Sequence, residues 1–587
     1  MMNEFLKPQH LSYYGSYMIL SYLKRDMEPN TFAAAEILKK GIYLRSARGK
    51  STGKKAALKI IPTFNGNPAE YFCETLFNEI QVKTDNGNIG LTFADEDTIL
   101  IKGKGKNMGL ILDTMATFKF DYILEIPSTS GQCFSVTSYK TLTKYLVYAI
   151  SGKISLDQNY YGDEYFQKET LVSRLKAEGE EGFLIAIKEI EGNMIAHDLN
   201  LYDYEKCRTD MQDRLNEFRS HYTQPSEEWK ETFDLCTYTL WSTGVRASGK
   251  LKKEMIMMSN SAATSAWAYD AGLTAYGLAL AHPQIAMNQI TNFFDRMDEL
   301  GAIPGSINDC SEKFLFLKAP AQGLFLSRLL KMIETDRDAK QHLYECLEKE
   351  LRYYQRYKDS NQDGICEYHQ GNEATLDNST TFDQVEVIDS PCLSAYLIRI
   401  MDLLSELAQQ LSDEASAAKW KKEADQLTKK ALEYFVTEDL RVVARVTRNG
   451  EEIKEEAILP YMFVILGSRL PEDLKKNILR ILREDYLAPY GLASEKLSSP
   501  KYEDDGYFRG PVWVQTTLPY VEGIEDCGDK ELAEEAAIRF CNAVRKSGSA
   551  ENFDAKTGKG YRDPVNTTSS GVFLYFYEKY LSKGIKQ

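Results

Sequence analysis

The chain has 587 residues, of which 43% are hydrophobic and 27% are charged, and its formal net charge at pH 7 is −15. A chain of this length buries a sizeable core without disulfides or metal ions, and at roughly 100–200 residues per domain it predicts two or more domains. The acidic balance argues against a nucleic-acid partner, because such proteins need a basic surface to neutralise phosphates.

The cysteines and the N-terminal residues indicate the cellular compartment in which we expect the protein. Ten cysteines are scattered along the chain without any CxxC pair, which is typical of reduced core residues in a cytosolic protein. The first 26 residues lack a charged segment followed by an apolar segment and a cleavage site, and no run of about 18 apolar residues occurs. We therefore expect a cytoplasmic protein with no membrane partner.

The N-terminal third reads as β-structure. Short β-rich runs alternate with turn residues, which predicts an antiparallel β-sandwich over residues 1–205. The predicted strands cover 41–46, 56–64, 87–93, 97–103, 109–115, 120–126, 133–138 and 181–190. A polar helical segment, 206–230, follows as a linker.

From residue 231 to 587 the pattern becomes helical. In the segment 391–411 leucines and an isoleucine recur every three or four residues, which predicts one buried face of an amphipathic helix. Ser390 and Pro391 suit the N-cap and the first helical position. Reading on in this way predicts roughly twelve helices.

These helices fall into pairs, because short connections alternate with long ones. The long connections cover 301–320, 359–390, 437–455, 485–510 and 547–569. In an (α/α)6 barrel of six helical hairpins, alternate connections emerge on one rim, where loops held by a rigid scaffold carry a functional site. The pattern alone also allows an all-α solenoid whose loops vary in length.

The long connections collect acidic and aromatic residues. The second contains six acids between residues 358 and 384, among them Asp377, and the fifth contains Glu551, Asp554 and Asp563. A sugar site needs aromatic faces for the C–H side of the ring, and cleavage of a glycosidic bond needs two carboxyl groups. Acidic surface loops are also common without any such role, so composition alone is a weak signal.

Other chemistries fit less well. The sequence has no GxSxG elbow, no HExxH motif and only six histidines, and we expect neither a metal nor a cofactor. The segment 49–55, GKSTGKK, lacks the spacing of a phosphate loop. The segment 359–364, DSNQDG, opens like a calcium loop, but position twelve is Gln370, so we expect a turn rich in Asx residues.

Five motifs in order resemble glycoside hydrolase family 63 and its mannosylglycerate-hydrolase-like bacterial branch. They are WAYDAG (267–272), KAPAQG (318–323), DSNQDGICEY with EATLDNST (359–380), PYGLASE with YEDDGYFRGPVW (489–513) and AENFDAKTGKG (550–560). The resemblance covers about residues 255–575. It implies an (α/α)6 barrel behind an N-terminal β-sandwich, and hydrolysis of a small α-glycoside with inversion.

The resemblance also implies the site residues. Asp377 matches the general acid and Glu551 the general base, although the two roles could be exchanged without altering the motif match. The pKa of Asp377 should then be raised, Glu551 should stay ionised, and the carboxyl groups should lie roughly 6.5–9.5 Å apart. By the same matching, the substrate should be bound by Trp267, Tyr269, Asp270, Gln322, Asn378, Phe508, Arg509, Gly510 and Trp513.

Two departures and two alternatives remain. Relatives usually carry Trp at the position of Phe508 and an aromatic residue near Thr568, so the sugar preference can differ here. A trehalase-like or rhamnosidase-like enzyme of another (α/α)6 family is one alternative, and a non-catalytic carbohydrate-binding protein is the other. The sequence names neither the sugar and linkage nor the oligomeric state.

Overall fold

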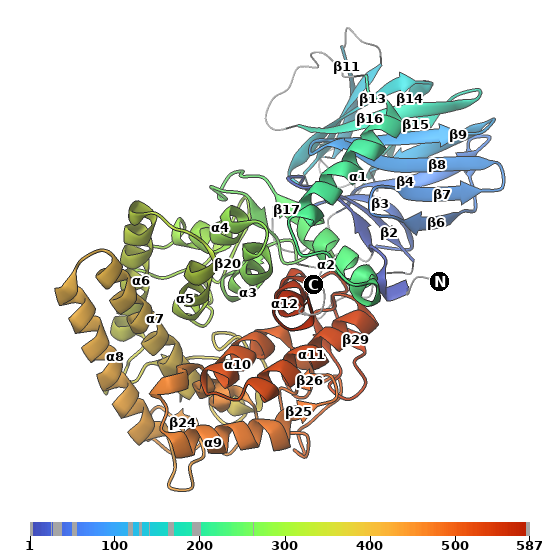
Figure 1. Ribbon diagram of the computed structural model, residues 1–587. Coiled ribbons are helices and arrows are strands. Elements are labelled where there is room, and N and C mark those ends of the chain that lie inside the picture. The colour runs from blue at the N-terminus through green and yellow to red at the C-terminus, as the bar shows by residue number, and fades with distance from the viewer. Residues whose placement is uncertain are drawn as a thin grey trace.

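The computed structural model describes residues 4–24, 26, 38–49, 56–114, 121–127, 132–139, 141–161, 170–190, 201–261 and 263–582. A β-rich part formed by the first third of the chain lies beside a larger helical part formed by the rest (Figure 1). Of the segment 49–55 only Gly49 is described, so the expectation for that motif lies outside the described residues.

Two eight-stranded antiparallel sheets form the β-rich part. The first has the order β1-β2-β3-β4-β10-β15-β14, with β5 paired to β4. Its strands are β1 (His10–Leu11), β2 (Met18–Leu23), β3 (Gly41–Ser46), β4 (Ala56–Phe64), β5 (Asn67–Pro68), β10 (Met108–Asp113), β14 (Lys153–Tyr161) and β15 (Thr170–Glu178).

The second sheet has the order β11-β12-β13-β16-β9-β8-β7-β6. Its strands are β6 (Phe72–Thr75), β7 (Ile80–Thr84), β8 (Gly87–Asp95), β9 (Thr98–Lys104), β11 (Tyr122–Ile126), β12 (Cys133–Ser138), β13 (Thr143–Ser151) and β16 (Gly182–Ile190). Strands of the two sheets lie against each other, with β2 beside β6, β10 beside β9 and β16, and β15 beside β16. The two sheets therefore pack face to face, as period-two alternation requires.

The predicted antiparallel strands are confirmed. The bounds predicted for β3, β4 and β12 agree with the structure to the residue, while Met115 and Phe120 of two other predicted strands lie outside the described residues. The strands β1, β2, β5, β6, β7, β13, β14 and β15 were not predicted. They are very short or mix polar with apolar residues, and pairing with neighbouring strands identifies them.

The segment expected as a linker is attached to the sandwich. Helix α1 (Tyr204–Ser220) packs against β8, with Met211 and Leu215 buried. A short 3-10 turn, η2 (Glu227–Trp229), leads into α2 (Lys230–Ser242).

The helical part consists of hairpins of long helices. They are α3 (Ala268–Ala279), α4 (Pro283–Phe294), α5 (Gln322–Met332), α6 (Arg337–Tyr357), α7 (Pro391–Gln410), α8 (Glu414–Phe435), the 3-10 helix η4 (Leu459–Arg469), α9 (Glu472–Ile481), α10 (Val514–Asp526), α11 (Lys530–Ser547) and α12 (Thr567–Phe576). Shorter turns are η1 (Glu4–Leu6), η3 (Thr380–Phe382), η5 (Leu482–Tyr486) and η6 (Tyr577–Leu581). All five predicted long connections lie between these helices.

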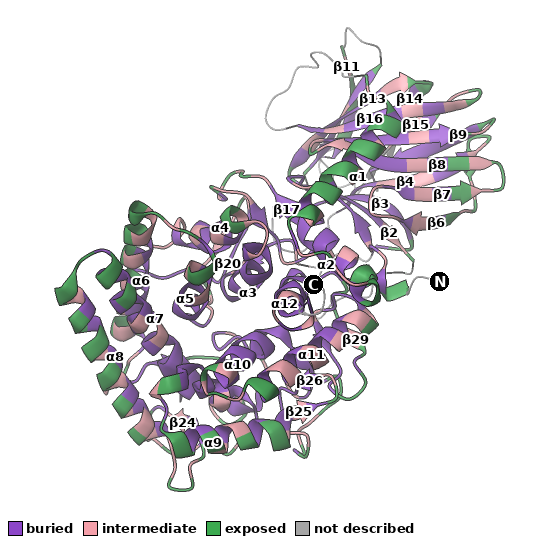
Figure 2. Cartoon of the chain, viewed as in Figure 1, coloured by how far each residue is buried: buried purple, intermediate pink, exposed green. Residues whose placement is uncertain are grey.

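The helices make two kinds of contact. Each of α3, α5, α7, η4, α10 and α12 packs against the next in this series, and α12 packs against α3. Outside this series, α2 packs on α12, α4 on α3, α6 and α8 on α7, α9 on η4 and α11 on α10. Helices α3 and α12 are buried along their whole length, whereas α8 exposes one face (Figure 2).

Short strands stiffen the long connections. They form β17 (Gly244–Val245) with β18 (Met255–Ile256); β19 (Ala266–Trp267) with β20 (Ser306–Ile307) and β21 (Glu312–Lys313); β22 (Glu367–Tyr368) with β23 (Ile388–Asp389) and β24 (Arg445–Val446); β25 (Leu487–Ala488) with β26 (Gly491–Leu492); and β27 (Val512–Trp513) with β28 (Asn552–Phe553) and β29 (Gly560–Tyr561). Backbone hydrogen bonds between these strands satisfy N–H and C=O groups that a buried loop would leave without partners.

Two local predictions can be compared with the structure. The leucine-rich face of α7 is buried and Ser390 is its N-cap residue, but the Ser390 side chain makes no capping hydrogen bond. In DSNQDG, Asn361 Oδ1 accepts from the Asp363 backbone N–H at 3.1 Å and Asp363 Oδ1 accepts from Ile365 N–H at 2.7 Å. These are the Asx turns that the sequence predicted.

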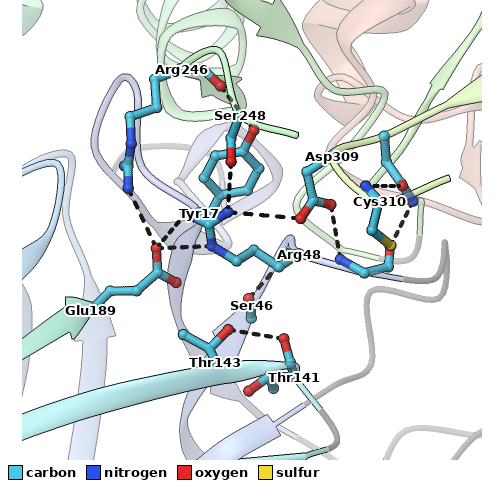
Figure 3. A network of polar contacts seen from close by, with 12 residues as sticks. Tyr17, Ser46, Arg48, Thr141, Thr143, Glu189, Arg246, Ser248, Asp309 and Cys310 are labelled. Atoms are coloured by element: carbon cyan, nitrogen blue, oxygen red, sulfur yellow. Dashed lines mark hydrogen bonds and ion pairs between the residues drawn. The ribbon is translucent and has the colours of Figure 1, made fainter. Parts of the chain in front are cut away.

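A polar network joins the two parts (Figure 3). Arg48, which follows β3, donates through Nε and Nη2 to Glu189 Oε2 at 3.1 and 3.0 Å, and through Nη1 to Ser248 Oγ at 3.1 Å. Its guanidinium lies 4.0 Å above the ring of Tyr17 and 3.7 Å from Asp309. The end of β3 thus contacts two connections of the helical part.

None of the ten cysteines, which all lie in the described residues, forms a disulfide, and eight of them are buried. None of the helices in the described residues is long and apolar enough to cross a membrane.

Candidate active site

Asp377 lies in the connection between α6 and α7. Its Oδ1 is 3.4 Å from Lys318 Nζ, and its Oδ2 accepts a hydrogen bond from the Tyr507 hydroxyl at 3.3 Å. The side chain of Asp377 is 34% exposed, whereas that of Lys318 is only 7% exposed. Lys318 also donates to the backbone oxygen of Asn372 at 3.0 Å. The carboxyl group is therefore held by two donors and remains open to solvent.

Asn378 joins this connection to the one before α10. Its Nδ2 donates to Gly506 O at 3.0 Å and its Oδ1 accepts from Phe508 N–H at 2.8 Å. Arg509 Nε donates to Asn378 O at 2.8 Å, and Arg509 also pairs with Asp383 at 2.5 Å. Asn378 and Arg509 thus fix the two connections to each other.

Aromatic side chains of the connection before α10 pack together. The rings of Phe508 and Trp513 stack at 4.0 Å, and the Tyr507 ring lies edge-on to both at 4.9 Å. Trp513 Nε1 donates to Tyr507 O at 2.7 Å. Tyr507 adopts φ 63°, a left-handed conformation that non-glycine residues seldom take and that recurs at functional sites.

Gly510 is required by the same connection. Its φ is 150°, and a Cβ at this position would lie 2.2 Å from Glu503 O. Its N–H donates to Ser494 Oγ at 3.0 Å. Only glycine fits here without moving the backbone.

Glu551 lies in the connection between α11 and α12. Its backbone N–H donates to Asp563 O at 2.8 Å, and Asp563 N–H donates to Glu551 Oε2 at 3.4 Å. Burial, assisted by the charges of Asp563 and Asp270, raises the pKa of Glu551 to about 8, while Arg562 opposes the shift. This raised pKa runs against the expectation that Glu551 stays ionised.

The Tyr507 hydroxyl is influenced by both carboxyl groups. Burial raises the pKa of its hydroxyl well above the usual range, and the charges of Asp377 and Glu551 raise it further. The guanidinium of Arg562 lies 4.9 Å above the Tyr507 ring and pairs with Asp505 at 2.7 Å. Asp377 and Glu551, from different connections, thus act on one tyrosine.

The start of α3 supplies a third acid. Asp270 is buried, accepts from Gln515 Nε2 at 2.7 Å, and has a pKa raised by burial against the opposing effect of Lys318. Trp267 is half-buried at the N-cap of α3. Tyr269 is directed elsewhere, since its buried hydroxyl bonds the Tyr396 hydroxyl and Gln515 O, both at 2.9 Å. Tyr269 thus supports the site from behind.

Gln322 is the first residue of α5 and is 4% exposed. Its Oε1 and the Oε1 of Gln515 are buried without a hydrogen-bond partner among the described residues. A buried acceptor of this kind needs a donor, from water or from a ligand.

Lys318, Tyr507 and Asp563 were not predicted as members of the site. Lys318 opens the KAPAQG motif and Tyr507 precedes Phe508 in YFRGPVW. Asp563 was noted only as one acid of its loop. Their position in the motifs was the available signal, but contacts between connections far apart in the sequence identify them.

Comparisons with known proteins identify the family of this chain. The model of the mannosylglycerate hydrolase MGH1-like glycoside hydrolase domain matches residues 263–570. A mannosylglycerate hydrolase from Thermus thermophilus is 30% identical over 89 residues, which are 15% of this chain and 21% of that relative. The match thus spans about a fifth of that protein's length.

Solved structures share the fold of more than half of this chain. The GH63 mannosylglycerate hydrolase from Thermus thermophilus in complex with glucose has a TM-score of 0.52 at 17% identity, covering 59% of this chain and 99% of its own. The GH63 enzyme in complex with Tris and D-glycerate has a TM-score of 0.50 at 16% identity, covering 58% and 98%. The chain belongs to the mannosylglycerate hydrolase MGH1-like glycoside hydrolases of glycoside hydrolase family 63.

Proposed function

We propose that this protein hydrolyses an α-glucosidic or α-mannosidic bond of a small glycoside with inversion, with Asp377 as general acid and Glu551 as general base. The observation that carries the proposal is that Tyr507 donates a hydrogen bond to Asp377 while the charge of Glu551, from a separate connection, also acts on its hydroxyl. A carbohydrate-binding protein has no need for such a pair, because sugar hydroxyls are bound without proton transfer.

The residues divide the reaction between them. Asp377 protonates the leaving oxygen, and the Tyr507 hydroxyl that bonds its Oδ2 fixes the orientation of the carboxyl group. Glu551 removes a proton from a water molecule, which attacks the anomeric carbon from the opposite face. Inversion requires the two carboxyl groups to lie roughly 6.5–9.5 Å apart, so that the sugar and the water fit between them.

The remaining residues would bind the sugar or shape its pocket. Trp267, Phe508 and Trp513 offer aromatic faces, and Asp270 and Gln322 offer acceptors for sugar hydroxyls. Asn378, Arg509 and Gly510 hold the connection before α10 in place. Tyr269 acts through Gln515, which it contacts together with Asp270.

We also infer that the helices form an (α/α)6 barrel. The closed series of contacts from α3 to α12 supports an inner ring of six helices, and the helices packed outside it support an outer ring. The domains would then be a β-sandwich at 1–205, a helical segment at 206–230 and a catalytic barrel at 231–587.

The anomer released first tests the proposal. Proton NMR would follow wild type and Asp377→Asn on a panel of α-glucosides, glucosylglycerate and mannosylglycerate. We expect the β-anomer first from an α-linked substrate, and no release by Asp377→Asn. Initial release of the α-anomer would mean retention and would overturn the role of Glu551.

A further inference from the structure

One cavity of the structure lies outside the candidate active site. Its volume is about 580 Å³, and it is bounded by η4, α9 and the connections 439–457 and 495–501. We name it the η4–α9 cavity; six residues give it its chemical character, namely Arg441, Glu455, Tyr461, Tyr486, Glu495 and Lys501. None of the residues that line it is among the proposed sugar-binding or catalytic residues.

Two carboxyl groups in this cavity are bonded to hydroxyls. Glu495 is fully buried, and its Oε2 accepts from Thr380 Oγ1 at 2.8 Å while its Oε1 accepts from Ser499 Oγ at 2.7 Å. Glu455 accepts from Thr381 Oγ1, but its Oε1 is buried without a hydrogen-bond partner among the described residues. A buried carboxyl oxygen normally accepts a hydrogen bond, so Glu455 Oε1 needs a donor.

Most cations around the cavity are already engaged by other acids. Arg441 pairs with Asp439 at 2.8 Å and with Glu452 at 2.9 Å, and Lys501 pairs with Asp383 at 2.8 Å. Lys496 pairs with Asp485 at 3.5 Å, and Arg480 pairs with Glu484 at 2.6 Å. Lys454 is exposed. Within the described part of the chain, no lysine or arginine forms an ion pair with Glu455 or Glu495.

Two tyrosines complete the lining. The rings of Tyr461 and Tyr486 lie 5.8 Å apart at an interplanar angle of 56°. Aromatic faces attract alkylammonium groups through the ring quadrupole, and carboxylates neutralise their charge. Aromatic rings beside unpaired carboxyl groups therefore favour an organic cation over an anion or a neutral sugar.

We propose that the η4–α9 cavity is a second binding site, which takes an organic ammonium cation against Glu455, Glu495 and the two tyrosines. This site is independent of the proposed hydrolytic activity. Its occupant would lie behind the loop that carries Asp377, because Thr380 and Thr381, bonded to the two glutamates, follow Asp377 in the same loop.

Binding should depend on pH. Burial raises the pKa of Glu455 to about 8, with Glu495 adding to the shift and Lys501 and the Thr381 hydroxyl opposing it. Arg441, Lys496, Glu456 and Asp485 face the same cavity, but the first two are paired with acids. A permanent cation binds the ionised form, so its affinity should rise about tenfold between pH 7 and pH 9.

Isothermal titration of the full chain with choline tests the proposal, and uncharged 3,3-dimethylbutan-1-ol, which has the same shape, serves as the comparison. We expect one choline per chain, no binding of the neutral compound, and at least tenfold weaker binding to Glu455→Gln at pH 9. Glu452→Gln is the matched control, since Glu452 lines the same cavity but pairs with Arg441, and its effect should stay within about threefold.

Two further measurements separate this site from the active site. Asp377→Asn should bind choline as wild type does, and choline should slow hydrogen exchange of the backbone amides at 378–383 in wild type. The proposal is overturned by equal binding of the neutral compound, by binding lost in Asp377→Asn but kept in Glu455→Gln, or by no binding to wild type at pH 9. These outcomes do not depend on whether any glycoside is hydrolysed.

Discussion

Glu551 shows how a single carboxyl group is tuned by its surroundings. Its removal from water is the largest cause of the raised pKa, and the charges of Asp563 and Asp270 add to it because a second negative charge nearby disfavours ionisation. A general base with a pKa near the working pH combines a usable ionised fraction with adequate basicity. The environment of Glu551 suits a proton acceptor of this kind.

The pH dependence of kcat/KM should report this group. A base must be ionised to act, so the rate should fall about tenfold per pH unit below pH 8 and level off above it. Initial rates at substrate concentrations well below KM, from pH 5 to pH 10, would measure the profile. Replacement by Glu551→Gln should lower kcat by roughly 10²–10⁴-fold.

The direction in which kcat/KM changes with pH also shows whether Glu551 acts as the base or as the acid. If kcat/KM declines above pH 8 instead, Glu551 acts as the acid, and the two roles proposed for Asp377 and Glu551 are exchanged. A profile that stays unchanged in the residual activity of Glu551→Gln would assign the titration to another group.

Tyr507→Phe should slow the reaction without unfolding the site. The change removes the hydrogen bond to Asp377 but keeps the ring edge-on to Phe508 and Trp513. A hydrogen bond worth about 0.5–1.5 kcal/mol net corresponds to a roughly 2–10-fold loss of kcat, with KM nearly unchanged. Tyr502→Phe is the control, because the buried Tyr502 hydroxyl has no hydrogen-bond partner among the described residues; an equal loss there would refute the assignment.

At the scale of elements, the site depends on connections rather than helices. The connection before α10 carries the aromatic cluster and is fastened to the Asp377 loop by Asn378 and Arg509. The short sheet of β27, β28 and β29 joins the same connection to the one that carries Glu551. Side-chain hydrogen bonds therefore position the loop of Asp377, and backbone pairing positions the connection of Glu551.

Gly510→Ala should disturb this arrangement. The new Cβ would collide with Glu503 O, and the strained φ adds to a cost of about 1–3 kcal/mol. We expect kcat/KM to fall at least about tenfold, since small displacements of positioned groups are costly, and the melting temperature to fall by a few degrees.

Gly528→Ala separates strain from collision. Gly528 has φ 99°, but a Cβ there would meet no atom within 4 Å. Its substitution should cost some stability and leave kcat/KM unchanged. If both variants lost activity equally, general destabilisation would explain the effect of Gly510→Ala.

At the scale of the whole molecule, the β-sandwich and the helical part are joined by buried charges. Glu189 is buried on β16, and its main cationic partner is Arg48, with Arg246 at 3.7 Å. Burial raises the pKa of Glu189 and Arg48 lowers it, so the pair is held together against desolvation. The interface therefore relies on partners supplied by both parts.

Arg48→Met should weaken this interface. Removing one partner of a buried pair leaves the other charge uncompensated, which typically costs about 3–5 kcal/mol, and Arg246 should place the effect at the lower end. Urea unfolding followed by circular dichroism would measure the loss. Arg480→Met, which breaks the exposed pair with Glu484, should change stability by less than about 1 kcal/mol; comparable losses would contradict a special role for Arg48.

Features that depend on near neighbours in the chain were predicted from the sequence, whereas features that depend on contacts between distant residues were not. The strand at 56–64 and the helix at 391–410 follow from the periodicity of apolar residues, which depends on near neighbours in the chain. Polar strands such as β14 have no such signal and are defined by their pairing with β15. The N-cap at Ser390 was located correctly, but the side-chain bond expected of it is absent.

Local patterns in the amino-acid sequence were enough to establish the two-part organisation, the alternation of short and long connections, and the motifs that identify the family. Each of these properties depends on residues close together in the chain. The three-dimensional arrangement was needed to find that Lys318 and Tyr507 hold Asp377, that the Tyr269 hydroxyl is bonded to Tyr396 and Gln515, and that the pKa of Glu551 is raised. Burial and charge proximity arise when connections distant in sequence meet, so no local pattern contains them.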